Sequence, residues 1–140
     1  MRRAIALCFV CLIALLGAAE AQYPAKPVRI VVPTAPGGSA DVLARMLTAH
    51  WGKALGQQFY IENRGGAGNV LGIEQVARAP ADGTTLLLGA GTITINHVVY
   101  KKLPYDALRD FAPISQLVSV PNVLVVHPSQ PIHSLADFIA

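Results

Sequence analysis

The sequence has few charged residues, few aromatic residues and almost no cysteine. Of its 140 residues, 14% are charged and 6% are aromatic, and the formal net charge is only +3. No block of like charges and no stretch of basic and aromatic residues is present, so nothing indicates a nucleic-acid partner. The two cysteines, Cys8 and Cys11, both lie close to the N-terminus, ahead of Gln22. We therefore expect no disulfide and no thiolate metal site in the remaining chain.

The usual motifs of catalysis and nucleotide binding are also missing. The four histidines form no close pair of metal ligands, and no G-x-S-x-G nucleophile motif occurs. The glycines at positions 66, 68 and 72 do not match the G-x-G-x-x-G spacing, and there is no phosphate-binding P-loop motif. We therefore expect no metal, no cofactor and no enzymatic activity. A small exported α/β enzyme remains the alternative.

The N-terminus has the layout of a secretory signal peptide. Met1-Arg2-Arg3 is a short positive segment, the run from Ala4 to Leu16 is apolar throughout, and Ala19-Glu20-Ala21 is a small-x-small cleavage site. An apolar run of this length is too short to span a bilayer core of about 30 Å. We predict a signal peptide over residues 1–21, cleavage after Ala21, and a periplasmic product.

Downstream, apolar strands alternate with helical patterns. Strands are predicted at 28–32, 59–62, 85–89, 112–119 and 122–126, and helices at 40–55, 70–78 and 97–102. Ser39 and Asn69 are predicted N-caps, Gly56 is a predicted C-cap, and Ser134 opens a capping box. Continuous apolar strands that alternate with helices predict an α/β fold, with a mostly parallel sheet covered by helices on both faces.

The loop between the first strand and the first long helix is the strongest candidate site. It contains Ala35, Pro36, Gly37, Gly38 and Ser39. In open α/β sheets ligands bind at the carboxyl ends of strands, and glycines let a ligand approach the backbone. The free N–H groups at a helix start favour an anion, so the loop is a candidate carboxylate or phosphate cradle. An ordinary glycine turn with a serine cap explains the same residues equally well.

Asp41 complicates this interpretation, because its charge would repel an anion bound close to it. Asp41 either orients the loop through hydrogen bonds or meets an ammonium or hydroxyl group of a ligand. After the third strand, Gly91 and Thr92 form the next candidate, and Thr92 offers a hydroxyl group. Asn96 is expected to cap the short helix or to reach a ligand. Arg64, in the second glycine-rich loop, is interpreted as solvated or structural.

Read in order, these segments resemble one known family. The resemblance is carried by segments 23–33, 35–41, 62–64, 66–68, 81–87, 103–106 and 110–114. The chain resembles the Bug-type extracytoplasmic solute receptors of tripartite tricarboxylate transporter systems. The resemblance implies a periplasmic binding protein of the type II kind, with two α/β lobes and a cleft. It also implies a small carboxylated solute, a membrane permease as partner, no cofactor and a monomeric state.

The resemblance places the ligand carboxylate on Ala35, Pro36, Gly37, Gly38 and Ser39, with Asp41 beside them. Gly91 and Thr92 are implied to face the same cleft, whereas the segment 62–68 is implied to be structural. Two lobes of ordinary size need at least twice this length. We therefore expect only the N-terminal portion of such a receptor, with a first lobe over 22–119 and crossover strands and the start of a second lobe over 120–140. A non-functional truncated remnant is a further alternative.

Overall fold

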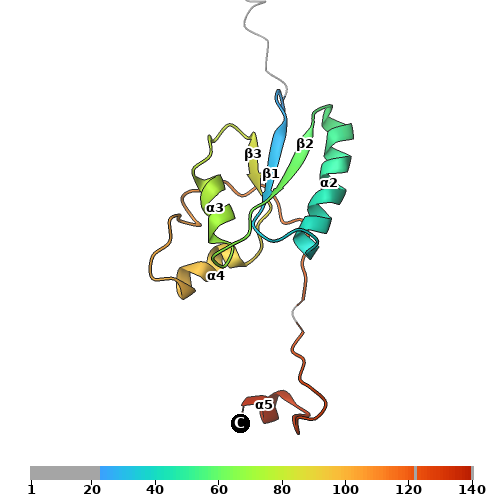
Figure 1. The fold of residues 1–140 in the computed structure, drawn as a ribbon, viewed down its shortest axis with the longest axis vertical. Coiled ribbons are helices and arrows are strands. Elements are labelled where there is room, and N and C mark those ends of the chain that lie inside the picture. The colour runs from blue at the N-terminus through green and yellow to red at the C-terminus, as the bar shows by residue number, and fades with distance from the viewer. Residues whose placement is uncertain (1–22, 122, 140) are drawn as a thin grey trace, which may run out of the picture.

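The computed structural model describes residues 23–121 and 123–139, so the predicted signal peptide lies outside the described residues (Figure 1). The elements in chain order are β1 (Val28–Val32), α2 (Ser39–Leu55), β2 (Phe59–Asn63), α3 (Val70–Ala77), β3 (Thr85–Leu87), α4 (Thr92–Val99) and α5 (Leu135–Ile139). None of the helices within this part of the chain has the length and apolar character needed to cross a bilayer.

The three strands form one parallel sheet in the order β2-β1-β3. Val28 of β1 is in register with Phe59 of β2, and Arg29 is in register with Thr85 of β3. β1 takes the central position because four of its five residues are buried, as expected for a strand covered on both faces. The predicted parallel sheet is confirmed.

Helices cover both faces of this sheet (Figure 1). α2 packs on one face, where Val28, Ile30 and Val32 meet Ala44 and partly buried side chains of α2 and β2. α3 packs on the other face, where Ile73 is 0% exposed and forms a cluster with Val70 and Tyr105. The β1 residues in the first core, Val28, Ile30 and Val32, alternate along the strand, which is the period expected of side chains on one face.

A glycine lets α3 lie close to the segments that follow β1 and β2. Gly72 is buried, and a Cβ atom added there would lie 2.5 Å from the carbonyl oxygen of Arg64 and 2.9 Å from Pro33 Cα. Both neighbours belong to the chain just beyond the carboxyl ends of strands. This close approach joins the start of α3 to the segments that follow β1 and β2.

The helix ends confirm some predictions and contradict others. Gly56 adopts the left-handed conformation, with φ of 66°, and ends α2 as predicted. Ser39 is not an N-cap: it is the first residue of α2, Gly38 is the N-cap, and no side chain caps this helix. The helix starts one residue early because Asp41 binds the N–H of Gly37 and thereby closes the turn through the glycines.

The third connection also differs from the prediction. The predicted helix over 97–102 is in fact α4, Thr92–Val99, because the turn at Gly91 starts the helix immediately: Gly91 O accepts hydrogen bonds from the N–H groups of Thr94 and Ile95. Asn96 therefore lies within the helix and is not its cap. β3 is shorter than predicted and ends at Leu87.

The strands predicted at 112–119 and 122–126 are wrong for the described part of those segments. Residues 112–121 and 123–126 form neither helix nor strand, and their apolar side chains are exposed, with Val120 at 73% and Val125 at 79%. A strand needs a partner to take its backbone hydrogen bonds, and among the described residues none pairs with this segment. The capping box after it is confirmed, since Ser134 Oγ accepts the N–H of Asp137 at 3.2 Å.

Candidate functional site

The carboxyl ends of the three strands lie on one edge of the sheet. The segments 33–38, 64–69 and 88–91 leave this edge and lead into α2, α3 and α4 (Figure 1). β1 and β3 are neighbours, yet the chain after β1 enters α2 on one face while the chain after β3 enters α4, which contacts α3 on the other face. Such a reversal between adjacent strands is the position where open α/β sheets bind ligands.

The segment after β1 is exposed at this edge. Every residue from Ala35 to Ser39 is exposed, and Gly37 has φ of 87°, a conformation that side-chain-bearing residues rarely adopt. Because no side chain caps α2, the N–H groups of its first turn remain directed at the edge. Such a helix start carries partial positive charge and favours a bound anion.

Asp41 is buried behind this segment, with 2% of its surface exposed. Its carboxylate accepts the N–H of Gly37 at 2.9 Å, two N–H groups of Arg45 at 3.0 Å each, and the Nδ2 amide of Asn63 at 3.0 Å. The guanidinium of Arg45 contributes most to lowering the pKa of Asp41 from 3.8 to about 2, and the Gly37 N–H contributes next. These contacts favour the first interpretation of Asp41, that it orients the loop through hydrogen bonds.

Asn63 is a residue whose contribution the sequence did not reveal. It ends β2, and its Nδ2 bonds both to Asp41 and, at 3.4 Å, to the carbonyl oxygen of Thr34. The amide therefore ties the end of an edge strand to the loop after the central strand. The hydroxyl oxygen of Thr34 in the same loop is buried and, within the described residues, lacks a hydrogen-bond partner.

The second candidate, Gly91 and Thr92, lies at the start of α4. Gly91 is exposed, and Thr92 is half-buried as the first residue of the helix. Thr92 Oγ1 accepts a hydrogen bond from Asn69 Nδ2 at 3.2 Å. Among the described residues, no hydrogen bond joins Gly91 or Thr92 directly to the segment from Ala35 to Ser39.

The glycine-rich loop 64–69, interpreted from the sequence as structural, connects these two candidates. A Cβ atom on Gly65 would lie 3.4 Å from the backbone N of Ala35, so this loop packs against the segment after β1. At its other end, Gly68 O accepts from Asn96 Nδ2 at 3.0 Å, and Asn69 reaches Thr92. The structure thus brings three segments together, whereas the sequence predicts only two of them as parts of the site.

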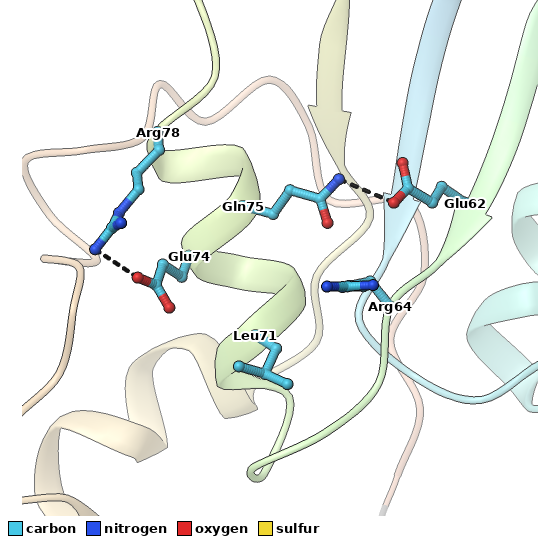
Figure 2. A pocket seen from close by; sticks show the side chains of 6 residues that line it. All are labelled: Glu62, Arg64, Leu71, Glu74, Gln75 and Arg78. Carbon is cyan, nitrogen blue, oxygen red and sulfur yellow. Dashed lines mark hydrogen bonds and ion pairs between the residues drawn. The ribbon is translucent and has the colours of Figure 1, made fainter.

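An open depression of about 390 Å³ lies beside the edge, between β2 and α3 (Figure 2). It is lined by Glu62, Arg64, Leu71, Glu74, Gln75 and Arg78. Glu62 is bound by Arg29 and Gln75, and Glu74 pairs with Arg78, so most of the charged groups here are already satisfied. None of the predicted site residues lines this depression. It is a polar surface groove rather than the predicted anion site.

No cluster of three or more histidine, cysteine or acidic side chains suited to a metal occurs within residues 23–121 and 123–139. The predicted site residues offer the backbone N–H groups at the exposed start of α2 and the hydroxyl groups of Ser39 and Thr92. These groups donate hydrogen bonds without carrying a full charge, and they suit the reversible binding of a small anion.

Comparison with known protein families gives one match. The model for the tripartite tricarboxylate transporter family receptor matches residues 43–140. Among curated relatives, Protein BugT of Bordetella pertussis is 41% identical over 120 residues, which cover 84% of this chain and 37% of the relative.

Solved structures give the same picture. The R. palustris protein Rpa4515 with adipate is 40% identical with a TM-score of 0.72, over 84% of this chain and 40% of that one. MatC (Rpa3494) from Rhodopseudomonas palustris with bound malate is 42% identical with a TM-score of 0.60, over 65% of this chain and 31% of that one. The chain thus spans between 31% and 40% of the length of these three relatives.

Proposed function

Because this chain belongs to the tripartite tricarboxylate transporter receptor family, we propose that it contributes the first lobe of a receptor that captures a small carboxylated solute. The carboxylate binds at the carboxyl edge of the sheet, on Ala35 to Ser39, with Gly91 and Thr92 on the other side of the loop that follows β2. The members of this family are transporter receptors. We therefore propose that the protein binds and releases its solute without changing it chemically.

One observation carries this proposal. α2, α3 and α4 all start at the same edge, and no side chain caps any of the three starts. Helix starts without side-chain caps leave some N–H donors for a ligand, and their dipoles add at an anion placed between them. At α3 the Val70 N–H, and at α4 the Ile93 and Thr94 N–H groups, already bind backbone carbonyl oxygens, so α2 offers the most free donors. Arg45, the cation beside the first start, is already bound in a bidentate manner to Asp41. Neutral donors on a rigid support would therefore hold the carboxylate.

The structures with adipate and malate support a dicarboxylate as the solute. A first lobe that holds one carboxylate through backbone donors leaves the second carboxylate to another part of the protein. We propose that residues 22–119 form this first lobe and that 120–140 begin the connection to a second lobe. The exposed apolar side chains between 114 and 126 would be covered by that lobe.

The remaining features of the proposal concern the place of action. The N-terminal sequence favours export through a signal peptide cleaved after Ala21 and a periplasmic location. There the receptor, a monomer, would pass its solute to a membrane permease. Lobe closure around the solute would exclude water and define the form that the permease recognises.

Isothermal titration with adipate and malate tests the function. Ser39→Asp places a negative charge at the exposed start of α2, where it suits the helix dipole but repels a bound carboxylate. We expect at least tenfold weaker binding with an unchanged melting temperature. Gln58→Glu adds the same charge at the opposite end of the sheet and should bind as the unmodified protein does. No heat with any carboxylate, or full binding by Ser39→Asp, would contradict the proposal.

A further inference from the structure

We propose that Asn69 is a positioning residue that fixes the hydroxyl group of Thr92 as a hydrogen-bond donor toward the solute. The inference rests on the proposed function, because it assigns a role to a residue beside the carboxylate site. Asn69 ends the loop that follows β2, and Thr92 is the first residue of α4. Asn69 Nδ2 donates to Thr92 Oγ1 at 3.2 Å, a contact between segments far apart in the sequence.

The backbone of Asn69 shows why an asparagine stands there. Its φ of 73° and ψ of 0° place it in the left-handed region, which asparagine and aspartate tolerate better than other side-chain-bearing residues. As the N-cap of α3, an asparagine ordinarily binds an N–H group of its own helix. Here no such bond forms, and the amide turns to the neighbouring helix instead. The Asn69 side chain thus binds Thr92 and makes no capping hydrogen bond to the N–H groups of α3.

This bond determines what the Thr92 hydroxyl can offer. A hydroxyl group has one proton to donate and two lone pairs that accept. Asn69 occupies a lone pair, and among the described residues no acceptor takes the Thr92 proton. The amide Nδ2 has only N–H bonds on it and cannot accept that proton itself. The proton of Thr92 therefore remains available at the edge of the sheet, next to the exposed Gly91.

The direction of this hydroxyl contributes to solute selection. A carboxylate presents only acceptors and matches the free proton, whereas an ammonium group presents only donors and does not. Asn69 would thus give Thr92 the same polarity as the backbone N–H groups at the starts of α2 and α4. All donors at the edge then point toward one anionic group.

Asn69→Asp tests the inference with little change of shape. The new carboxylate accepts the Thr92 proton, which reverses the hydroxyl and leaves only lone pairs for the solute. Aspartate tolerates the left-handed backbone as asparagine does, so the melting temperature should hold. Loss of a hydrogen bond to a charged group predicts about ten- to hundredfold weaker binding of malate and adipate. Gln58→Glu serves as the matched amide-to-acid control and should retain the original affinity.

Two readouts test positioning against other causes: the first excludes a merely structural loss, and the second, with an uncharged substitution, excludes a merely electrostatic one. The first is the ratio of the original to the variant affinity as pH is lowered through the carboxyl range, about pH 5 to 3.5. A protonated carboxyl group can again donate to Thr92, so the ratio should return toward one. The second is Asn69→Ala in a Thr92→Val background, where the positioning effect has nothing to act through. In this background, Asn69→Ala should weaken binding by less than a further twofold beyond the loss of affinity that Thr92→Val causes alone.

The outcomes are distinct. Undiminished binding by Asn69→Asp, or an Asn69→Ala loss that is equally large with and without the Thr92 hydroxyl, would overturn the inference while the receptor function stands. If the unmodified protein gives no heat with malate, adipate or other small carboxylates, the proposed function fails and the inference fails with it. Weakened binding that recovers at low pH and depends on Thr92 supports both.

Discussion

Gly72→Ala should destabilise the fold even though alanine is the better helix former. The added Cβ would lie 2.5 Å from the Arg64 carbonyl oxygen and 2.9 Å from Pro33 Cα, whereas 3.4 Å is ordinary contact. The helix must therefore retreat by up to 0.9 Å, the difference between 3.4 and 2.5 Å. Both obstacles are backbone atoms, so neither can move aside as a flexible side chain would.

The retreat of α3 would loosen the contacts of Ile73, which is 0% exposed. Overpacking of this kind costs about 1–3 kcal/mol. The gain in helix propensity from glycine to alanine returns at most about 1 kcal/mol. We expect a net loss of about 1–2 kcal/mol in the free energy of unfolding. Urea denaturation followed by circular dichroism measures it, with a matching fall in melting temperature of about 4–8 °C per kcal/mol.

Gly52→Ala is the matched control, because Gly52 lies within α2 and its nearest obstacle, Gln57 O, is 3.4 Å away. There only the propensity term applies, and the variant should be more stable by about 0.5–1 kcal/mol. The two substitutions should thus have opposite signs. If Gly72→Ala were as stabilising as Gly52→Ala, the close approach of α3 to the sheet would be refuted.

Three further predictions follow from burial and charge. Ile73→Ala should lower the free energy of unfolding by about 2–5 kcal/mol, whereas Val99→Ala, at a side chain 66% exposed, should change it by less than about 0.5 kcal/mol in the same urea assay. Asn96→Leu should cost about 1–3 kcal/mol, because the Gly68 carbonyl and the buried Tyr105 hydroxyl each lose the Asn96 amide that binds them; equal stability by calorimetry would contradict this. The pKa of Asp41 is lowered from 3.8 to about 2, so its carboxylate stabilises the fold above pH 4, and this contribution is lost as pH falls toward 2. Asp41→Asn should therefore be less stable at pH 7. In melting experiments at different pH values, the variant should lose less stability between pH 4 and pH 2 than the unmodified protein does.

Periodicity predicted the sheet and its helices because local patterns decide them. β1 is bounded by prolines and is apolar at four of its five positions, and α2 ends at Gly56 as its sequence predicts. The two strands that do not form have a cause that is not local. The segment 112–126 has the composition of strands, but a strand forms only where a partner takes its hydrogen bonds, and composition does not reveal whether one is present. Its described side chains are largely exposed instead.

The sequence predicts two separate loops as the candidate site and does not indicate that the loop 64–69 lies between them. Asn63 and Asn69 flank the glycines of this loop, and each contributes by reaching sideways to a segment far away in the sequence, Asn63 to Asp41 and Asn69 to Thr92. Such contacts have no sequence signature. The cap preference of asparagine was even misleading, because the Asn69 amide serves a neighbouring helix. Arg45 also illustrates this, since its charge is visible in the sequence while its pairing with Asp41 is not.

The strand order β2-β1-β3 has a consequence for when this chain can fold. β1 is made first, yet Val28 pairs with Phe59 and Arg29 pairs with Thr85, and both partners are synthesised much later. The segments between the strands, which include α2 and α3, must bring the strands together before any strand pair can form. The entropy lost in closing such long segments makes parallel sheets slow to form. The central strand therefore stays unpaired until β2 has been synthesised to Asn63, and it gains its second partner only when β3 is complete at Leu87. If the chain is exported as we propose, this delay would keep it unfolded while it crosses the inner membrane. The lobe would then fold in the periplasm.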